Sequence, residues 1–149
     1  MSFRQGAAVL GVLGAVTLAT GCGGGIQAPD LFVVQRTGSG PGARLTLLVN
    51  EEGGVQCFQD PTHPGPTLKL SDPQLVQARA IQEGLHDSAA KHLSLAAGAG
   101  SVLGYYLRDE NGTVRFSDNS PGQPAVLRQL ALFVLQTARQ VCHLPQQGA

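Results

Sequence analysis

The sequence predicts an α+β domain, a two-layer sandwich in which an antiparallel sheet of about five strands carries two helices on one face. Short runs rich in β-branched and aromatic residues are separated by turn residues, which is typical of hairpins. Two longer segments have apolar residues at three- and four-residue steps, which is typical of amphipathic helices. Their order along the chain is β-β-β-α-β-β-α, so the helices can cover the apolar face of hairpin-linked strands.

The strand-forming runs are short and regularly punctuated. We expect strands at residues 31–36, 44–49, 55–58, 102–108 and 113–117. Between the last two, Asn111-Gly112 favours a tight hairpin turn because both residues tolerate positive φ. Asn111-Gly112-Thr113 also matches a glycosylation sequon, which we interpret as this turn. Residues 59–71 contain Pro61, Pro64 and Pro66, so we predict a loop that stays outside the sheet.

Two helices are expected, one from Asp72 to about residue 91 and one from residue 125 to about residue 142. Asp72 is the predicted N-cap of the first helix, with Pro73 at the first helical position. Gly84 should weaken this helix by up to about 1 kcal/mol relative to Ala. The predicted buried positions are Leu75, Ala78, Ile81, Leu85 and Ala89 in the first helix, and Leu127, Leu130, Val134, Ala138 and Val141 in the second.

The first 21 residues have the pattern of an export signal. Arg4 precedes residues 6–20, which carry no charged side chain. This run is shorter than the roughly 20 residues that span a bilayer, but it suits the apolar part of a signal peptide. The sequence Leu-Ala-Thr-Gly-Cys at 18–22 resembles the lipobox of bacterial lipoproteins. The resemblance implies that Cys22 receives a diacylglyceryl group and becomes the first residue of the mature protein.

A glycine run, residues 23–25, follows the lipobox and favours a flexible tether over a continued helix. We therefore divide the chain into a signal peptide (1–21), a lipidated tether (22–29), a globular domain (30–145) and a C-terminal tail (146–149). Two acyl chains, at about 0.8 kcal/mol per buried methylene, would hold the protein on the extracytoplasmic face of the cell membrane. The alternatives are an ordinary signal peptide with a chance cysteine, or a buried N-terminal helix.

The cysteine count supports export. The chain has three cysteines. If Cys22 carries lipid, Cys57 and Cys142 remain as a pair, and outside the cytoplasm such a pair usually forms a disulfide. Closing a loop of about 85 residues would stabilise the fold by about 4–5 kcal/mol. Two separate buried thiols are the alternative.

The charge balance limits the partners. Ten Lys and Arg residues face ten Asp and Glu residues. Nucleic-acid binding favours a basic face, and electrostatic docking on anionic lipid favours clustered positive charge, so we expect neither. The acylated Cys22 is the predicted contact with the bilayer. Binding of a protein partner at the cell surface is also compatible with the sequence.

Motifs for catalysis are missing from the sequence. There is no metal-binding histidine spacing, no C-x-x-C, no nucleophile elbow and no phosphate-binding glycine loop. We therefore expect no catalytic residue, no metal and no cofactor. Asp60, His63 and Ser71 lie near one another, but the proline-rich loop between them argues against a triad. The histidines, which we interpret as exposed surface residues, are His63, His86, His92 and His143.

Two further resemblances bear on function. Residues 47–49 (Leu-Leu-Val), 54–57 (Gly-Val-Gln-Cys) and 62–64 (Thr-His-Pro) resemble the early part of Streptomyces subtilisin inhibitor-type proteins. Those proteins are secreted antiparallel α+β domains that block serine proteases. The whole mature chain resembles small lipoproteins of high-GC actinobacteria with no assigned function, and we prefer this second resemblance.

Three functions therefore stay open. The first is a non-catalytic binding module at the cell surface, with the proline-stiffened loops 61–66 and 121–124 as exposed features. The second is a tethered serine-protease inhibitor-like domain. The third is a small extracytoplasmic hydrolase, which would need a pocket with converging titratable groups. The binding module is the function we expect.

Overall fold

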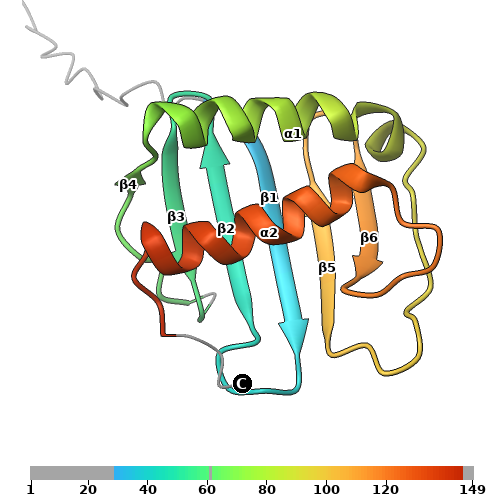
Figure 1. Cartoon of the computed structure of the whole chain (residues 1–149). Helices are drawn as coiled ribbons and strands as arrows, with labels where there is room; N and C mark the ends of the chain where they lie inside the picture. The colour runs from blue at the N-terminus through green and yellow to red at the C-terminus, as the bar shows by residue number, and fades with distance from the viewer. Residues whose placement is uncertain (1–28, 61, 146–149) are drawn as a thin grey trace, which may run out of the picture.

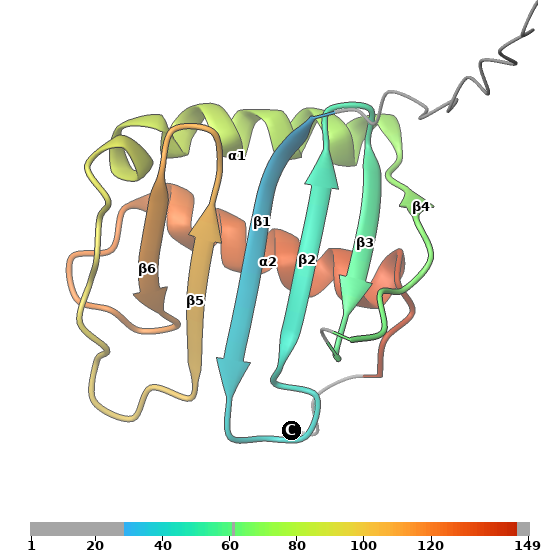
Figure 2. The ribbon, with the colours of Figure 1, turned by 180° about the vertical axis from the view of Figure 1, so that it is seen from behind.

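The computed structural model describes residues 29–60 and 62–145. They form a six-stranded antiparallel sheet with two helices packed on one of its faces (Figures 1 and 2). This confirms the predicted α+β class. The predicted signal peptide, Cys22 and most of the tether lie outside the described residues, as do Pro61 and the tail 146–149.

The sheet has the strand order β4-β3-β2-β1-β5-β6, and neighbouring strands are antiparallel. Its strands are β1 (Asp30–Gly38), β2 (Leu45–Asn50), β3 (Gly54–Phe58), β4 (Leu68–Lys69), β5 (Leu103–Arg108) and β6 (Thr113–Ser117). The chain forms β1 to β4 as a meander, crosses along a helix, and returns as the β5–β6 hairpin on the free side of β1. The longest strand therefore lies in the middle of the sheet.

Strand β4 corrects the prediction that residues 59–71 stay outside the sheet. Leu68 pairs with Val55, and the next residue pairs with Gly54. The amide of Leu70 also donates to the carbonyl oxygen of Gly53 at 2.9 Å. Pro66 is the last proline of this stretch, so the residues after it keep the N–H groups that pairing requires.

The helices are α1 (Asp72–Ala90) and α2 (Ala125–Gln140), and both cross the strands on the same side (Figure 1). The N-cap of α1 is Ser71, one residue before the predicted Asp72. Ser71 has an extended backbone, and its N–H donates to Oε1 of Gln74 at 2.9 Å, the reciprocal half of a capping box. Asp72 instead lies in the first turn, where its carboxylate interacts favourably with the positive end of the helix dipole.

The core lies between the helices and the sheet. Nearly all predicted helix positions are buried; Leu75 and Val141 are half-buried. Phe133 is also buried, and its ring meets that of Phe32 edge to face, with 6.1 Å between centroids. This pair joins α2 to the central strand.

Gly84 lies where the two helices approach each other. A Cβ atom at this position would lie 3.0 Å from Cγ2 of Val126, the second residue of α2. The glycine that weakens α1 locally therefore permits close packing of the helices.

The disulfide between Cys57 and Cys142 is present, with its Cα atoms 6.2 Å apart, which confirms that prediction. It joins β3 to the segment just after α2. Among the described residues no helix is both long and apolar enough to cross a bilayer.

Candidate binding site on the open sheet face

The helices leave one face of the sheet uncovered (Figure 2). Side chains alternate along each strand, so that Val34 and Arg36 are buried on the helix side whereas Gln35 and Thr37 are exposed on the other. We call the uncovered side the open face. By alternation and register its residues include Val33, Gln35, Thr37, Thr46, Leu48, Gln56, Phe58, Gly104, Tyr106, Arg108, Thr113, Arg115 and Ser117.

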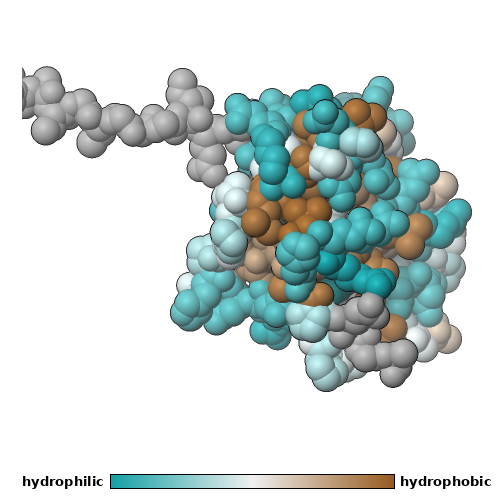
Figure 3. All heavy atoms as spheres, turned by 60° about the vertical axis from the view of Figure 1, so that its left-hand side comes forward, coloured by the Kyte–Doolittle hydropathy of each residue, from teal (hydrophilic) through white to brown (hydrophobic). Residues whose placement is uncertain are grey.

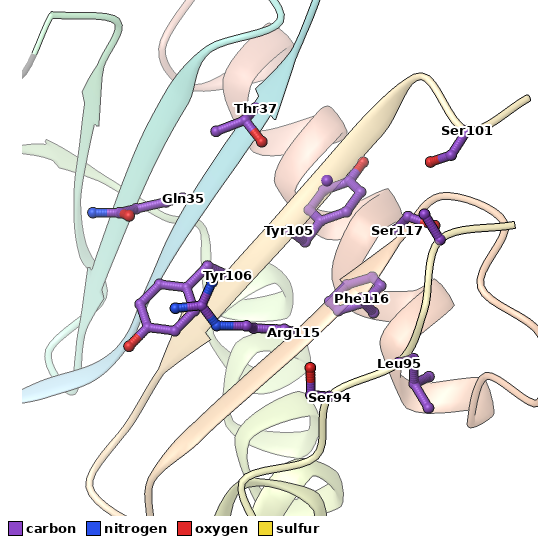
Figure 4. A pocket seen from close by; sticks show the side chains of 12 residues that line it. Gln35, Thr37, Ser94, Leu95, Ser101, Tyr105, Tyr106, Arg115, Phe116 and Ser117 are labelled. Atoms are coloured by element: carbon purple, nitrogen blue, oxygen red, sulfur yellow. The ribbon is translucent and has the colours of Figure 1, made fainter.

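A row of paired residues crosses the open face. Arg115 is opposite Tyr106, which is opposite Gln35, which is opposite Thr46. The guanidinium carbon of Arg115 lies 4.5 Å from the centre of the Tyr106 ring (Figure 4). Such a contact stabilises by about 0.5–1 kcal/mol at an exposed site and restricts the guanidinium to the ring. The row thus presents a positioned cation next to an amide and a hydroxyl group.

Beside this row the open face is hollowed, with a volume of about 540 Å³. Strands β1, β5 and β6 form its floor, and residues 94–101 form one wall. Its lining mixes hydroxyl, amide, guanidinium and aromatic groups: Gln35, Thr37, Ser94, Leu95, Ala97, Ser101, Gly104, Tyr105, Tyr106, Arg115, Phe116 and Ser117 (Figure 4). These groups are suited to recognising a polar ligand.

The wall is fixed to the sheet by backbone hydrogen bonds. The amide of Leu95 donates to the carbonyl oxygen of Arg115 at 2.9 Å, and the amide of Arg115 donates to Leu93 at 2.8 Å. Ser94 therefore forms an isolated parallel bridge with Arg115. This pairing covers the outer edge of β6 and holds the wall next to the cation.

Asp118, just after β6, fixes the far end of the wall. Its carboxylate accepts the hydroxyl of Ser101 at 2.7 Å and the amides of Val102 and Leu103 at 3.2 and 3.3 Å. Partial burial opposes ionisation of Asp118, but these hydrogen bonds, with the amide of Asn119, outweigh it and lower the pKa of the carboxyl. The ionised carboxylate is thus part of the structure of the wall.

Asn119 holds the middle of the same wall. Its side chain accepts the amide of Gly98 at 3.1 Å and donates to the carbonyl oxygen of Ala99 at 2.8 Å. A Cβ atom on Gly98 would lie 2.3 Å from the backbone oxygen of Asn119, so glycine is required for this close approach. The wall is therefore a bonded part of the domain.

Replacing Asp118 by Asn should destabilise the domain in a pH-dependent way. Because the folded-state pKa lies below the ordinary value of 3.8, the carboxylate stabilises the fold above about pH 4 and loses this effect as pH falls through the folded pKa. Urea unfolding should show a lower free energy of unfolding for Asp118→Asn than for wild type at pH 7, and this difference should be smaller at pH 3. Glu83→Gln, on α1, should change the free energy of unfolding by less than about 0.5 kcal/mol at pH 7. A constant gap across this range would contradict the role of Asp118.

The charged side chains of the strands that form the open face are mainly positive. Asp30, the first residue of β1, is the only acidic residue in the six strands. Arg108 and Arg115 lie on the open face, and Arg44, just before β2, lines a second hollow of about 250 Å³ beside Gln35. Among the described residues, both ion pairs join a histidine to an aspartate, so no carboxylate neutralises these three guanidinium groups.

Arg36 contrasts with the arginines of the open face. It is buried on the helix side and donates to the carbonyl oxygens of Ala43 and Gly42 at 3.0 and 3.1 Å. Burial lowers the pKa of its guanidinium, an effect that the nearby Tyr105 partly offsets. Arg36 thus fixes the β1–β2 connection.

The four histidines are all exposed, as predicted. His63 meets Asp60, with 2.9 Å between Nδ1 and Oδ2, whereas the hydroxyl of Ser71 bonds Gln74 instead. The proline-rich loop therefore brings together two of the three residues considered for a triad. Asp60 also accepts the amide and hydroxyl of Thr62, and these bonds, with that of His63, lower the pKa of its carboxyl.

The helix side offers a different kind of surface. Val76, Leu132 and Leu135 are exposed there, and Figure 3 shows apolar groups among hydrophilic ones on the side of β4 and the end of α2. Isolated exposed apolar residues are common on soluble domains. A hollow of about 510 Å³ beside α1 is lined by Glu83, Asp87 and Glu110, whereas the hollow of the open face is lined by Arg115.

Part of this site has a local signal in the sequence. Turn residues 109–112 set the register of the last hairpin, and this register places Tyr106 opposite Arg115. The position of Gln35 beside them depends on the pairing of β1 with β5, which joins distant parts of the chain.

Comparison with known proteins yields no relative: no family model, curated protein or solved structure matches the chain. Among the described residues, no three His, Cys, Asp or Glu side chains form a group that could hold a metal ion. The function is therefore inferred from the sequence, the fold and the surface.

Proposed function

We propose that this protein is a lipoprotein of the cell envelope, anchored through acylated Cys22 on the extracytoplasmic face of the membrane, and that its domain is a non-catalytic binding module. The observation that carries the binding function is the open face. It has a hollow with a bonded wall and three arginines without a carboxylate partner among the described residues. Its side chains donate and accept hydrogen bonds, which suits recognition of a ligand.

Two features support the anchoring part of this proposal. The lipobox-like sequence ends at Cys22, and the bond between Cys57 and Cys142 accounts for the other two cysteines of the chain. Disulfides persist mainly outside the cytoplasm, which agrees with export. A surface anchor also raises the effective concentration of a binding domain near its ligand, so that modest affinity is sufficient.

Replacing Cys22 by Ala should abolish lipid attachment and release the protein from the membrane fraction. The thiol of Cys22 is the attachment point of the diacylglyceryl group, which carries both acyl chains, so the loss should be complete. Metabolic labelling with an alkyne analogue of palmitate, followed by fractionation, measures both effects. The double variant Cys57→Ala/Cys142→Ala is the control and should keep its label. Label retained in Cys22→Ala would overturn the lipobox assignment.

The binding face is tested by photo-crosslinking in intact cells. A benzophenone amino acid at Gln35, on the open face, should yield crosslinked products. The same group at Leu132, which is 57% exposed on the helix side, should yield far fewer. Crosslinks from Leu132 without crosslinks from Gln35 would assign binding to the opposite surface and contradict the proposal.

A further inference from the structure

The open face presents three guanidinium groups beside planar polar groups, whereas the carboxylate of Asp118 in the wall is bonded to Ser101 and to the amides of Val102 and Leu103. Arg44, Arg108 and Arg115 carry the charge, and among the described residues no carboxylate lies within ion-pair distance of them. Gln35 and Tyr106 lie between them in the sheet. A ligand that neutralises this face must carry negative charge.

The spread of the arginines indicates an extended ligand. Neighbouring strands lie about 4.8 Å apart, so Arg115 on β6 and Arg44 at the start of β2 are separated by three strand spacings, or about 14 Å. Arg108 is on β5, between them in strand order, and the register places it two residues to one side of the row and Arg44 two residues to the other. A single small anion cannot contact all three, whereas a chain with repeated negative charges can.

The lining of the hollow suits a ligand with hydroxyl groups. This hollow presents hydroxyl-bearing side chains such as Thr37 and Ser94 next to apolar and aromatic ones such as Phe116, a mixture that can contact both the hydroxyl groups and the C–H faces of a sugar. Peptides in extended form add to a free sheet edge. Residues 93–95 already cover the edge next to the hollow, at β6, and the other edge, at β4, lies on the far side of the sheet. A sugar chain lying across the face can use its hydroxyl groups to bond these polar side chains.

The nature of the anion follows from how the arginines are presented. The guanidinium of Arg115 lies over the Tyr106 ring, which leaves its N–H edge available for two parallel bonds to a planar carboxylate. Phosphate sites often use helix N-termini, but both helices lie on the opposite side of the sheet. We infer, on the basis of the proposed binding function, that the open face binds an acidic polysaccharide whose charges are carboxylates.

The test is titration of the purified, processed full chain with polygalacturonic acid by isothermal calorimetry at low salt. Binding should weaken as salt rises, because screening lengths shorten to about 10 Å at 0.1 M. Arg115→Gln should raise the Kd about tenfold, since it removes a bidentate charged contact. Arg115→Lys should recover only part of this loss. Arg128→Gln removes an equal charge from exposed α2 and should leave the Kd unchanged.

Matched polymers separate the alternatives. Fully methyl-esterified polygalacturonate should bind at least tenfold more weakly, and equal binding would overturn the role of charge. Poly-L-glutamate or polyphosphate binding as tightly as polygalacturonate would overturn the assignment to a carboxylated sugar chain. Absence of polygalacturonate binding, or an equal effect of Arg128→Gln, would also overturn the inference. Crosslinking from Gln35 in cells reports on the binding function independently, so the two proposals can fail separately.

Discussion

Removing the disulfide should reduce the free energy of unfolding by about 4–5 kcal/mol in the double variant Cys57→Ala/Cys142→Ala. The two cysteines are separated by 85 residues, so the bond restricts the unfolded chain over most of the domain. Domains of this size are typically stable by about 5–15 kcal/mol, and this loss is therefore a large fraction of the total. Urea unfolding followed by circular dichroism measures it.

A control separates the bond from the side chains. Wild-type protein unfolded in the presence of a reductant should show the same midpoint as the double variant, whereas the variant itself should not respond to the reductant. The chain without the disulfide is less compact when unfolded. The free energy of unfolding should therefore also fall more steeply with urea concentration in the double variant than in oxidised wild type. A double variant as stable as oxidised wild type would show that the bond does not constrain the fold.

Replacing Phe133 by Ala should destabilise the domain by about 3–5 kcal/mol, because it leaves a cavity under α2. Phe133 is 1% exposed, and its ring contacts that of Phe32 edge to face. The neighbouring Leu132 is 57% exposed, and Leu132→Ala on the same helix should change stability by no more than about 0.5 kcal/mol. Thermal and urea unfolding of the two variants provide the comparison. Equal losses of stability in the two variants would contradict an α2 that buries Phe133 and exposes Leu132.

Double replacement tests the aromatic contact itself. The Phe32–Phe133 pair can stabilise the domain beyond the apolar area that it buries. In that case the loss of free energy of unfolding in Phe32→Leu/Phe133→Leu should differ from the sum of the losses in the two single variants. A coupling of about 0.5–1.5 kcal/mol is expected for such a ring pair. Additive losses would assign the whole effect to burial.

The elements that the sequence determined by itself are those with local causes. The apolar periodicity of α1 and α2, the turn at Asn111-Gly112 and the strand at residues 31–36 depend on residues close in the chain, and the structure confirms them. Cysteine counting paired Cys57 with Cys142 because only these two thiols remained once Cys22 was assigned to the predicted lipobox. These predictions needed no knowledge of which strands become neighbours.

The tertiary structure decided the features that join distant segments. Strand β4 exists because Leu68 meets Val55 after the proline-rich loop, and no local preference of a two-residue run specifies this. The open-face hollow exists because the β5–β6 hairpin pairs with β1, placing Tyr106 beside Gln35, and because Asp118 fixes the wall. Such contacts are stable only when burial of the common core offsets the entropy of closing long loops, so their energy depends on the whole fold and not on any one segment.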